Sequence, residues 1–246
     1  MTKKKIYFAS DVHLGLPNHK ESLLREKLFV RWLDMIKKDA SEIYLLGDIF
    51  DFWYEYKRVV PRGFTRFLGK IAEITDSGVP VHFFTGNHDV WMFDYFPKEL
   101  GVTVHRETIV REFDGKKFLI GHGDGLGKGD RGYKLLKWFF TNRVLQWLFA
   151  RLHPNFALWF GNRWSVNSRY SKEISHKFRG EHELITKFAR DTLEKEHFDY
   201  FIFGHWHSPV IHNLKDNSDL MLLGDWIVNY TYGAWDGEKL HLKRFK

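Results

Sequence analysis

Cysteine is absent from the 246-residue chain, which excludes disulfide bonds and thiolate metal sites. The sequence also has no apolar run close to the roughly 20 residues of a membrane-spanning helix. The basic first residues are followed only by the short apolar run 6–9, so no secretory signal is expected. Repeats and low-complexity segments are also absent. These absences predict a cytoplasmic globular protein, and they leave contact with a membrane surface open.

Positive charge is concentrated in one segment of the chain. The net charge is +7, yet residues 128–180 hold eleven Lys or Arg against only Asp130 and Glu173. Aromatic residues make up 17% of the sequence, a high share, and many of them lie in this same segment. Cations mixed with aromatic side chains predict an anionic or lipid-facing partner for residues 128–180 rather than a uniformly basic protein.

The first hundred residues alternate between strand and helix patterns. Short β-branched and aromatic runs at 5–8, 43–46 and 81–84 are typical of buried strands. Residues 20–38 and 62–77 carry apolar side chains at three- and four-residue spacing, which predicts amphipathic helices. This alternation predicts a parallel sheet covered by helices.

After residue 100 the pattern is mixed. Asp114-Gly115 separates two strand-like runs, and residues 200–242 contain several short runs divided by turns, which predicts antiparallel strands. We therefore expect an α/β fold in four layers, α-β-β-α, with two packed mixed sheets. Residues 127–180 are helical and apolar almost all round, with a break at Pro154. We expect one domain, 1–246, with a helical lid inserted at 127–180.

Five strand-like runs end in polar residues of one chemical kind. Carboxylate, imidazole and amide side chains suit divalent ions, with Mn favoured and Fe or Zn as alternatives. Within the pairs 11/13 and 205/207, alternation in extended backbone puts both side chains on one face. Seven ligands exceed the needs of one ion, so two ions that act on a phosphoryl group are expected. The candidate ligands are Asp11, His13, Asp48, Asn87, His122, His205 and His207.

The five clusters resemble, in order, the five motifs of the calcineurin-like metallophosphoesterases. Each motif is short, but together they span residues 11–207, which is most of the chain. The matching motifs are Asp11-x-His13, Gly47-Asp48-x-x-Asp51, Gly86-Asn87-His88-Asp89, Gly121-His122-x-Asp124 and Gly204-His205-x-His207.

The resemblance implies a role for each of these residues. His88 matches the family's histidine that contacts the phosphate or protonates the leaving group, and Asp89 would orient it. Asp51 and Asp124 match residues that support the ligands. One ion is implied on Asp11, His13, Asp48 and His207, and the other on Asp48, Asn87, His122 and His205, with Asp48 bridging.

A narrower resemblance is to the UDP-2,3-diacylglucosamine hydrolases of lipid A synthesis. It rests on residues 122–126, on Tyr133 and on the basic helical segment that follows. It implies cleavage of a pyrophosphate to UMP and the acylated sugar 1-phosphate at the cytoplasmic face of the inner membrane. The lid of these enzymes contacts phosphate and walls the acyl chains. Candidate substrate contacts here are Tyr133, Arg163, Asn167, Arg169 and Lys172.

The chain departs from that subfamily at His88, where those hydrolases usually carry Arg. A phosphodiesterase or phosphatase for another lipid-linked or nucleotide substrate therefore remains an alternative. A third hypothesis is a membrane- or nucleic-acid-binding module whose metal site only holds the fold. A complete two-metal ligand set favours catalysis, so no nucleic acid is expected, and no protein partner is implied.

Overall fold

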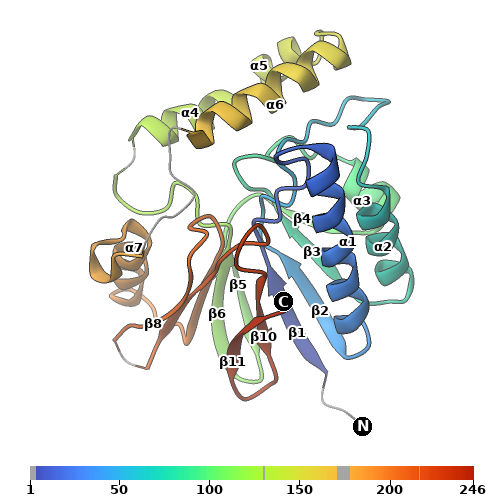
Figure 1. Cartoon of the computed structure of the whole chain (residues 1–246). Coiled ribbons are helices and arrows are strands. Elements are labelled where there is room, and N and C mark those ends of the chain that lie inside the picture. Colours follow the sequence, from blue (N-terminus) through green and yellow to red (C-terminus); the bar gives the residue numbers. More distant parts are fainter. Residues whose placement is uncertain (1–3, 130, 171–177, 216) are drawn as a thin grey trace.

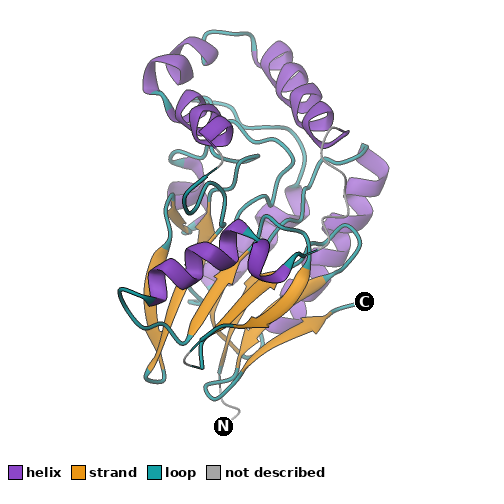
Figure 2. Ribbon diagram, turned by 90° about the vertical axis from the view of Figure 1, so that its left-hand side faces the viewer, coloured by secondary structure: helices purple, strands orange, loops and turns teal. Residues whose placement is uncertain are grey.

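The computed structural model describes residues 4–129, 131–170, 178–215 and 217–246 (Figure 1). Two sheets pack face to face, and helices cover their outer sides. Figure 2, seen from the side of α7 (Leu184–Leu193), shows the strands below a separate group of helices at the top. Within the described residues, none of the helices combines the length and apolarity required to cross a bilayer.

The first sheet has six strands in the order β11-β10-β1-β2-β3-β4. Its parallel part agrees with the expected alternation of strands and helices. The last two strands of the chain extend this sheet in antiparallel pairing. The strands are β1 (Lys5–Ala9), β2 (Ala40–Leu45), β3 (Val81–Phe84), β4 (Thr103–His105), β10 (Thr231–Trp235) and β11 (Leu240–Arg244).

The second sheet has five strands in the order β5-β6-β7-β9-β8. The expected hairpin joins its first two strands, and both Asp114 and Gly115 have the positive φ of a tight hairpin turn. The antiparallel strands expected after residue 200 are confirmed for β8 with β9, and β9 also pairs with β7 in parallel, so this sheet is mixed. The strands are β5 (Ile109–Phe113), β6 (Lys116–Gly121), β7 (Tyr200–Phe203), β8 (Pro209–Asn213) and β9 (Asp219–Leu223).

Three apolar layers hold the sandwich together. One lies between the first sheet and α1 (His19–Ile36), α2 (Thr65–Asp76) and α3 (Tyr95–Leu100). A second fills the space between the sheets, where Phe8 and Phe118 are fully buried. The third lies under α7 (Leu184–Leu193), which follows a 3-10 turn, η1 (Gly180–His182), and buries Ile185 and Ala189. The four-layer α-β-β-α fold is confirmed.

The helices α4 (Arg131–Thr141), α5 (Arg143–Phe149) and α6 (Pro154–Tyr170) lie over the loops that follow β2 and β3 (Figure 1). The hydroxyl of Tyr54 donates to the carbonyl of Gln146 at 2.8 Å, and the indole of Trp91 donates to the carbonyl of Phe140 at 2.9 Å. At Gly161 a Cβ would lie 2.2 Å from the ring of Phe52, so α6 approaches that ring closely. These contacts attach the α4–α6 segment to the sandwich.

Candidate metal centre

Five loops at the carboxyl ends of β1, β2, β3, β6 and β7 bring the candidate ligands together. The backbone there is unusual. Asp11, His13, Asp48, His205 and His207 all have positive φ, between 49° and 69°. Non-glycine residues avoid this region, at a cost of about 1–3 kcal/mol each, and such outliers cluster at functional sites. Five left-handed residues in one cluster indicate that the fold holds these side chains in place at the expense of local strain.

Close backbone packing brings the loops into contact. A Cβ at Gly204 would lie 2.6 Å from Oδ2 of Asp11, and a Cβ at Gly86 would lie 2.2 Å from Oδ1 of Asp48. Oδ2 of Asp11 accepts the backbone N–H of His205 at 2.9 Å. The glycines of the third and fifth motifs are therefore needed because a carboxylate occupies the space of a side chain.

The first ligand group consists of Asp11, His13 and His207, whose donor atoms lie within 4.8 Å of one another. Nε2 of His13 and Nε2 of His207 are 3.3 Å apart. Oδ1 of Asp11 lies 3.4 Å from Nε2 of His207 and, within the described residues, accepts no hydrogen bond. Two ligands about 2.1 Å from one ion are separated by roughly this distance. The group therefore fits a single cation.

The second group joins Asp48, Asn87, His122 and His205. Nε2 of His122 lies 3.4 Å from Oδ2 of Asp48 and 3.4 Å from Oδ1 of Asn87. Nδ1 of His205 lies 3.0 Å from the same Asn87 oxygen. Oxygen and nitrogen donors from four loops thus converge on a second point.

Asp48 lies between the two groups. Its Oδ1 accepts the backbone N–H of His88 at 2.9 Å, which fixes the orientation of the carboxylate. The other oxygen, Oδ2, is 3.4 Å from Nε2 of His122 and 4.0 Å from Nε2 of His13. This position is the one that a carboxylate bridging two ions requires.

Titratable groups in this buried space shift one another's pKa. Burial raises the pKa of Asp11, and burial together with the charge of His122 lowers the pKa of His205 to about 3. Burial also opposes a charge on His122, but Asp48 outweighs it and raises the pKa of His122 to about 10. A divalent cation balances such a set of carboxylates and imidazoles by taking the place of the protons.

Acceptors behind three of the histidines orient their rings. Nδ1 of His13 lies 3.5 Å from Oδ1 of Asp51, and Nδ1 of His122 lies 2.7 Å from the carbonyl of Leu46. Nδ1 of His207 lies 3.5 Å from Oδ2 of Asp225. Each ring thus directs Nε2 toward the ligand groups, the usual arrangement of a metal-binding histidine.

Sequence reasoning missed Asp225. Its carboxylate accepts the backbone N–H of Ile227, Val228 and Asn229, so its own loop holds it in place. A signal was present, because Gly224-Asp225 follows the apolar run of β9 in the same way as Gly47-Asp48 follows β2.

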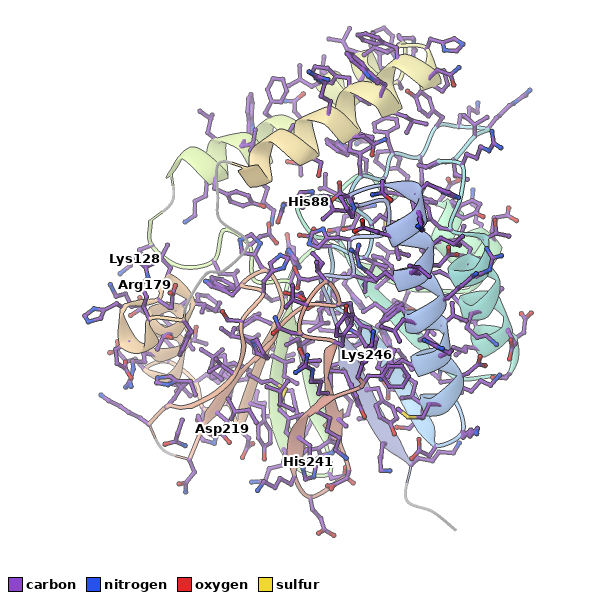
Figure 3. The ribbon with its side chains drawn as sticks, in the orientation of Figure 1. His88, Lys128, Arg179, Asp219, His241 and Lys246 are labelled. Carbon is purple, nitrogen blue, oxygen red and sulfur yellow. The ribbon has the colours of Figure 1, made fainter. Side chains whose placement is uncertain are left out.

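His88 lies at the edge of the cluster, beneath α4–α6 (Figure 3). Its Nδ1 is 3.0 Å from the carbonyl of Asp51 and 2.8 Å from Oγ of Ser165 on α6. Ser165 in turn donates to Oδ2 of Asp51 at 3.0 Å. No sequence signal distinguished Ser165, since a serine within a helix has no motif of its own.

Asp89 was expected to orient His88, but its contacts are with the backbone. Its carboxylate accepts the N–H groups of Gly86 at 2.8 Å, Asp48 at 3.2 Å and Ile49 at 2.9 Å. It therefore ties the loop after β3 to the loop after β2. The groups that lie beside Nδ1 of His88 are the hydroxyl of Ser165 and the carbonyl of Asp51.

The five residues expected to contact the substrate do not share one environment. The hydroxyl of Tyr133 donates to Oδ2 of Asp124 at 2.5 Å, and Lys137 donates to the same oxygen at 2.7 Å. Asp124 thus connects α4 to the loop of His122. Arg163 is exposed, and its guanidinium lies 5.9 Å from the ring centre of Trp159 in its own helix. Lys172 lies outside the described residues, as do the side chains of Asn167 and Arg169.

Comparison with known proteins gives one family. The family model described as calcineurin-like phosphoesterase matches residues 4–209. The UDP-2,3-diacylglucosamine hydrolase of Porphyromonas gingivalis strain W83 is 41% identical over 255 aligned residues, which cover 98% of this chain and 97% of that protein. The hydrolase of the same name from Actinobacillus succinogenes strain 130Z is 30% identical, with 90% and 92% covered. A solved archaeal phosphodiesterase aligns with 97% of this chain and 98% of its own, at 14% identity and a TM-score of 0.47.

Proposed function

Since this chain belongs to the calcineurin-like phosphoesterase family, we propose that it hydrolyses the pyrophosphate bond of UDP-2,3-diacylglucosamine, giving UMP and 2,3-diacylglucosamine 1-phosphate (lipid X). The observation that carries the proposal is Asp48, whose Oδ2 lies between two groups of metal-ligand type. The substrate is supported by similarity to hydrolases of that name along nearly the whole chain.

Each ligand group would hold one ion. The first ion would be held by Asp11, His13 and His207, and the second by Asn87, His122 and His205. Asp48 would be a ligand of both ions. Two bound ions supply positive charge at the attacking and leaving oxygens and lower the pKa of water. Carboxylate, amide and imidazole donors without thiolate favour Mn, with Fe or Zn as alternatives.

His88 is the catalytic residue of this proposal that binds no metal. The carbonyl of Asp51 can only accept a hydrogen bond, so Nδ1 of His88 carries the proton of that contact. Nε2 is then the ring nitrogen that faces a phosphate oxygen or the leaving oxygen. The ring stands edge-on to that of His13, with centres 5.1 Å apart, which places it beside the first ligand group.

The α4–α6 segment would act as a lid within one domain of residues 1–246. Tyr133, Arg163, Asn167, Arg169 and Lys172 remain the candidate substrate contacts of this segment. Large apolar side chains on these helices are exposed and would meet the acyl chains or the lipid surface. They include Leu135, Trp138, Phe139, Val144, Trp147, Phe156 and Trp159. The enzyme would thus work as a peripheral protein on the cytoplasmic face of the inner membrane.

UMP release from the UDP-lipid by purified, manganese-loaded protein tests this function. We expect turnover by the wild type and a loss of at least about a hundredfold in Asp48→Ala and Asn87→Ala. Asp236→Ala, which changes a carboxylate in the turn before β11, is the matched control and should remain active. If the protein cleaves a simple aryl phosphodiester but leaves the UDP-lipid intact, the proposed substrate is wrong and the proposed phosphoesterase activity is supported.

The histidine at position 88 favours a second candidate function. Because the UDP-2,3-diacylglucosamine hydrolases usually have Arg at this position, a different lipid-linked or nucleotide phosphoester is the alternative substrate. Turnover of the UDP-lipid compared with a panel of nucleotide diesters decides between the two. The binding-module hypothesis is not retained, because the chain is a member of a family of metal-dependent hydrolases.

A further inference from the structure

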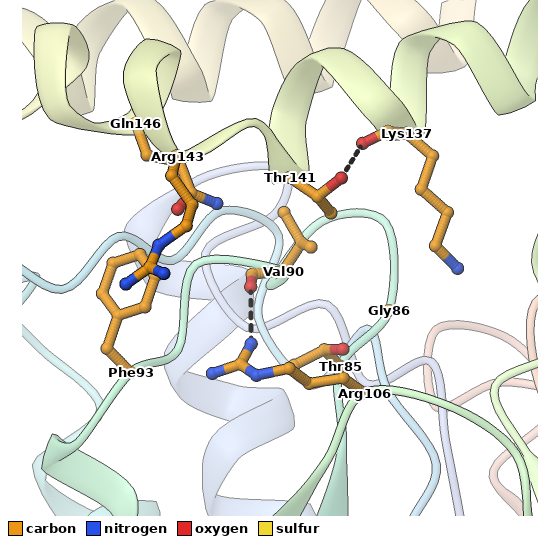
Figure 4. A pocket seen from close by; sticks show the side chains of 9 residues that line it. All are labelled: Thr85, Gly86, Val90, Phe93, Arg106, Lys137, Thr141, Arg143 and Gln146. Carbon is orange, nitrogen blue, oxygen red and sulfur yellow. Dashed lines mark hydrogen bonds between the residues drawn. The ribbon is translucent and has the colours of Figure 1, made fainter.

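A pocket with a volume of about 420 Å³ lies between the loop after β3 and the helices α4 and α5 (Figure 4). Figure 4 shows the side chains of Lys137 and Arg143 descending from the helices toward the residues of the sandwich. The lining residues are Thr85, Gly86, Val90, Phe93, Arg106, Lys137, Thr141, Arg143 and Gln146. This pocket is separate from the seven candidate ligands but begins at Gly86, one residue before Asn87.

Among the described residues that line the pocket, three carry positive charge and none is a carboxylate. Arg106 is held in place by the carbonyls of Val90 and Met92, to which its guanidinium donates. Lys137 lies between the pocket and Asp124, whose carboxylate it contacts at 2.7 Å. Arg143 is the first residue of α5 and has an exposed side chain. Such a lining attracts an anion, and burying an acyl chain there would desolvate charged groups.

The remaining lining residues suit a nucleoside. Phe93 is 38% exposed, and its ring offers a face on which a base can stack. Gln146 donates through Nε2 to the carbonyl of Phe140, which fixes its amide at the pocket wall. Two threonines add hydroxyl groups. Cations for a phosphate beside an aromatic ring and polar groups for a base and a ribose are the elements of a nucleotide site.

The pocket also lies next to the candidate metal centre, where the pyrophosphate would be cleaved. A pyrophosphate cleaved at Asn87 and His88 has two substituents, and Gly86, the residue before Asn87, lines this pocket. We propose that the pocket binds the nucleoside phosphate half of the substrate, which leaves as UMP. This inference rests on the proposed function, and it assigns Arg106, Lys137 and Arg143 to the nucleotide rather than to the lipid.

Calorimetric titration of the manganese-loaded protein with UMP tests the assignment. We expect Arg143→Ala and Arg143→Gln to weaken UMP binding about tenfold, the effect of losing one charge-assisted contact of about 1.4 kcal/mol. Inorganic phosphate has no nucleoside to occupy the pocket, so its affinity should fall much less. The ratio of the UMP and phosphate dissociation constants is therefore the measured quantity.

Arg151→Ala is the matched control. Arg151 follows α5 in the same segment but packs on the ring of Trp147, at 4.0 Å from the ring centre, and does not line the pocket. This variant should leave both dissociation constants unchanged. Unchanged UMP binding in the Arg143 variants would overturn the inference. Weaker binding of the acylated sugar 1-phosphate instead would assign the pocket to the lipid half and overturn it as well.

Failure of the proposed function gives a different result. If the UDP-lipid is not hydrolysed but UMP binds and depends on Arg143, the pocket is a nucleotide site of an enzyme with another substrate. If the UDP-lipid is hydrolysed but the Arg143 variants bind UMP as tightly as the wild type, the proposed function is supported and the pocket assignment is wrong.

Discussion

Oγ of Ser165 lies 2.8 Å from Nδ1 of His88, although the two residues are 77 positions apart in the chain. Ser165 is buried in α6, and one turn earlier Gly161 packs against Phe52. α6 therefore contacts His88, at the edge of the metal centre, through the hydroxyl group of Ser165. A change in the α4–α6 segment would alter the orientation of His88 as well as the shape of the cleft.

Replacement of Ser165 by Ala tests this relationship. Loss of one hydrogen bond costs about 1–1.5 kcal/mol, so we expect kcat to fall roughly fivefold to tenfold with little change in KM. In a His88→Ala background the same change should have no further effect, because the group it positions is gone. Asn162→Ala, an exposed change on the same helix, is the control. Equal losses in both backgrounds would show that Ser165 acts only through stability.

Asp225→Asn should weaken metal binding without unfolding the loop. The amide oxygen still accepts the backbone N–H groups, but the negative charge beside Nδ1 of His207 is lost. Partners of this kind contribute about 10- to 100-fold to metal affinity. Competition with a fluorescent chelator measures the change, and Asp219→Asn at the other end of β9 is the control. Wild-type affinity in Asp225→Asn would contradict the prediction.

Removal of metal should destabilise the folded protein. Ligands that bind only the native state add about 2.7 kcal/mol at one hundred times their dissociation constant, which corresponds to a shift in Tm of roughly 5–10 °C for a chain of this size. We expect a chelator to lower Tm and manganese to restore it. In Asp48→Ala the chelator should have little effect. If the chelator leaves the Tm of the wild type unchanged, the protein has no bound ions that stabilise it.

The exposed aromatic side chains of α4–α6 should direct the protein to lipid. Trp138 is 60% exposed and Trp147 is 56% exposed. Each buried aromatic group contributes about 1.5–3 kcal/mol, so Trp138→Ser with Trp147→Ser should reduce sedimentation with anionic vesicles at least tenfold. Met35→Ser, near the far end of α1, is an exposed apolar control. Equal sedimentation of both variants would place the lipid contact elsewhere.

His105 should make the fold sensitive to acid. Burial, with added repulsion from His82 and Arg111, lowers the pKa of His105 to about 4. The unfolded chain takes up this proton near its ordinary pKa of 6.5, so stability is lost as the pH falls from about 6.5 to about 4. Urea unfolding at pH 7 and pH 5 should show a smaller loss in His105→Gln. His197→Gln, at an exposed site, should behave as the wild type.

Much of the metal centre follows from short stretches of sequence. A strand that ends in glycine and then a carboxylate or imidazole, as at Gly47-Asp48 and Gly204-His205, carries its signal within a few residues. Parallel strands place their carboxyl ends at one edge of a sheet, so such local signals converge without further information. The four-layer arrangement followed from the same strand and helix patterns.

The supporting contacts did not follow from sequence. Asp89 was assigned to His88 because it is the next residue, whereas folding turns its carboxylate toward the backbone of Asp48 and Ile49. The side chain that contacts Nδ1 of His88 is Ser165, which is close to it only because of the packing of α6. The basic pocket likewise combines Arg106 with Arg143 across two elements. Sequence alone determined which side chains can bind metal, because that chemistry is local. Tertiary structure decided which groups orient them, because those contacts depend on the packing of distant segments.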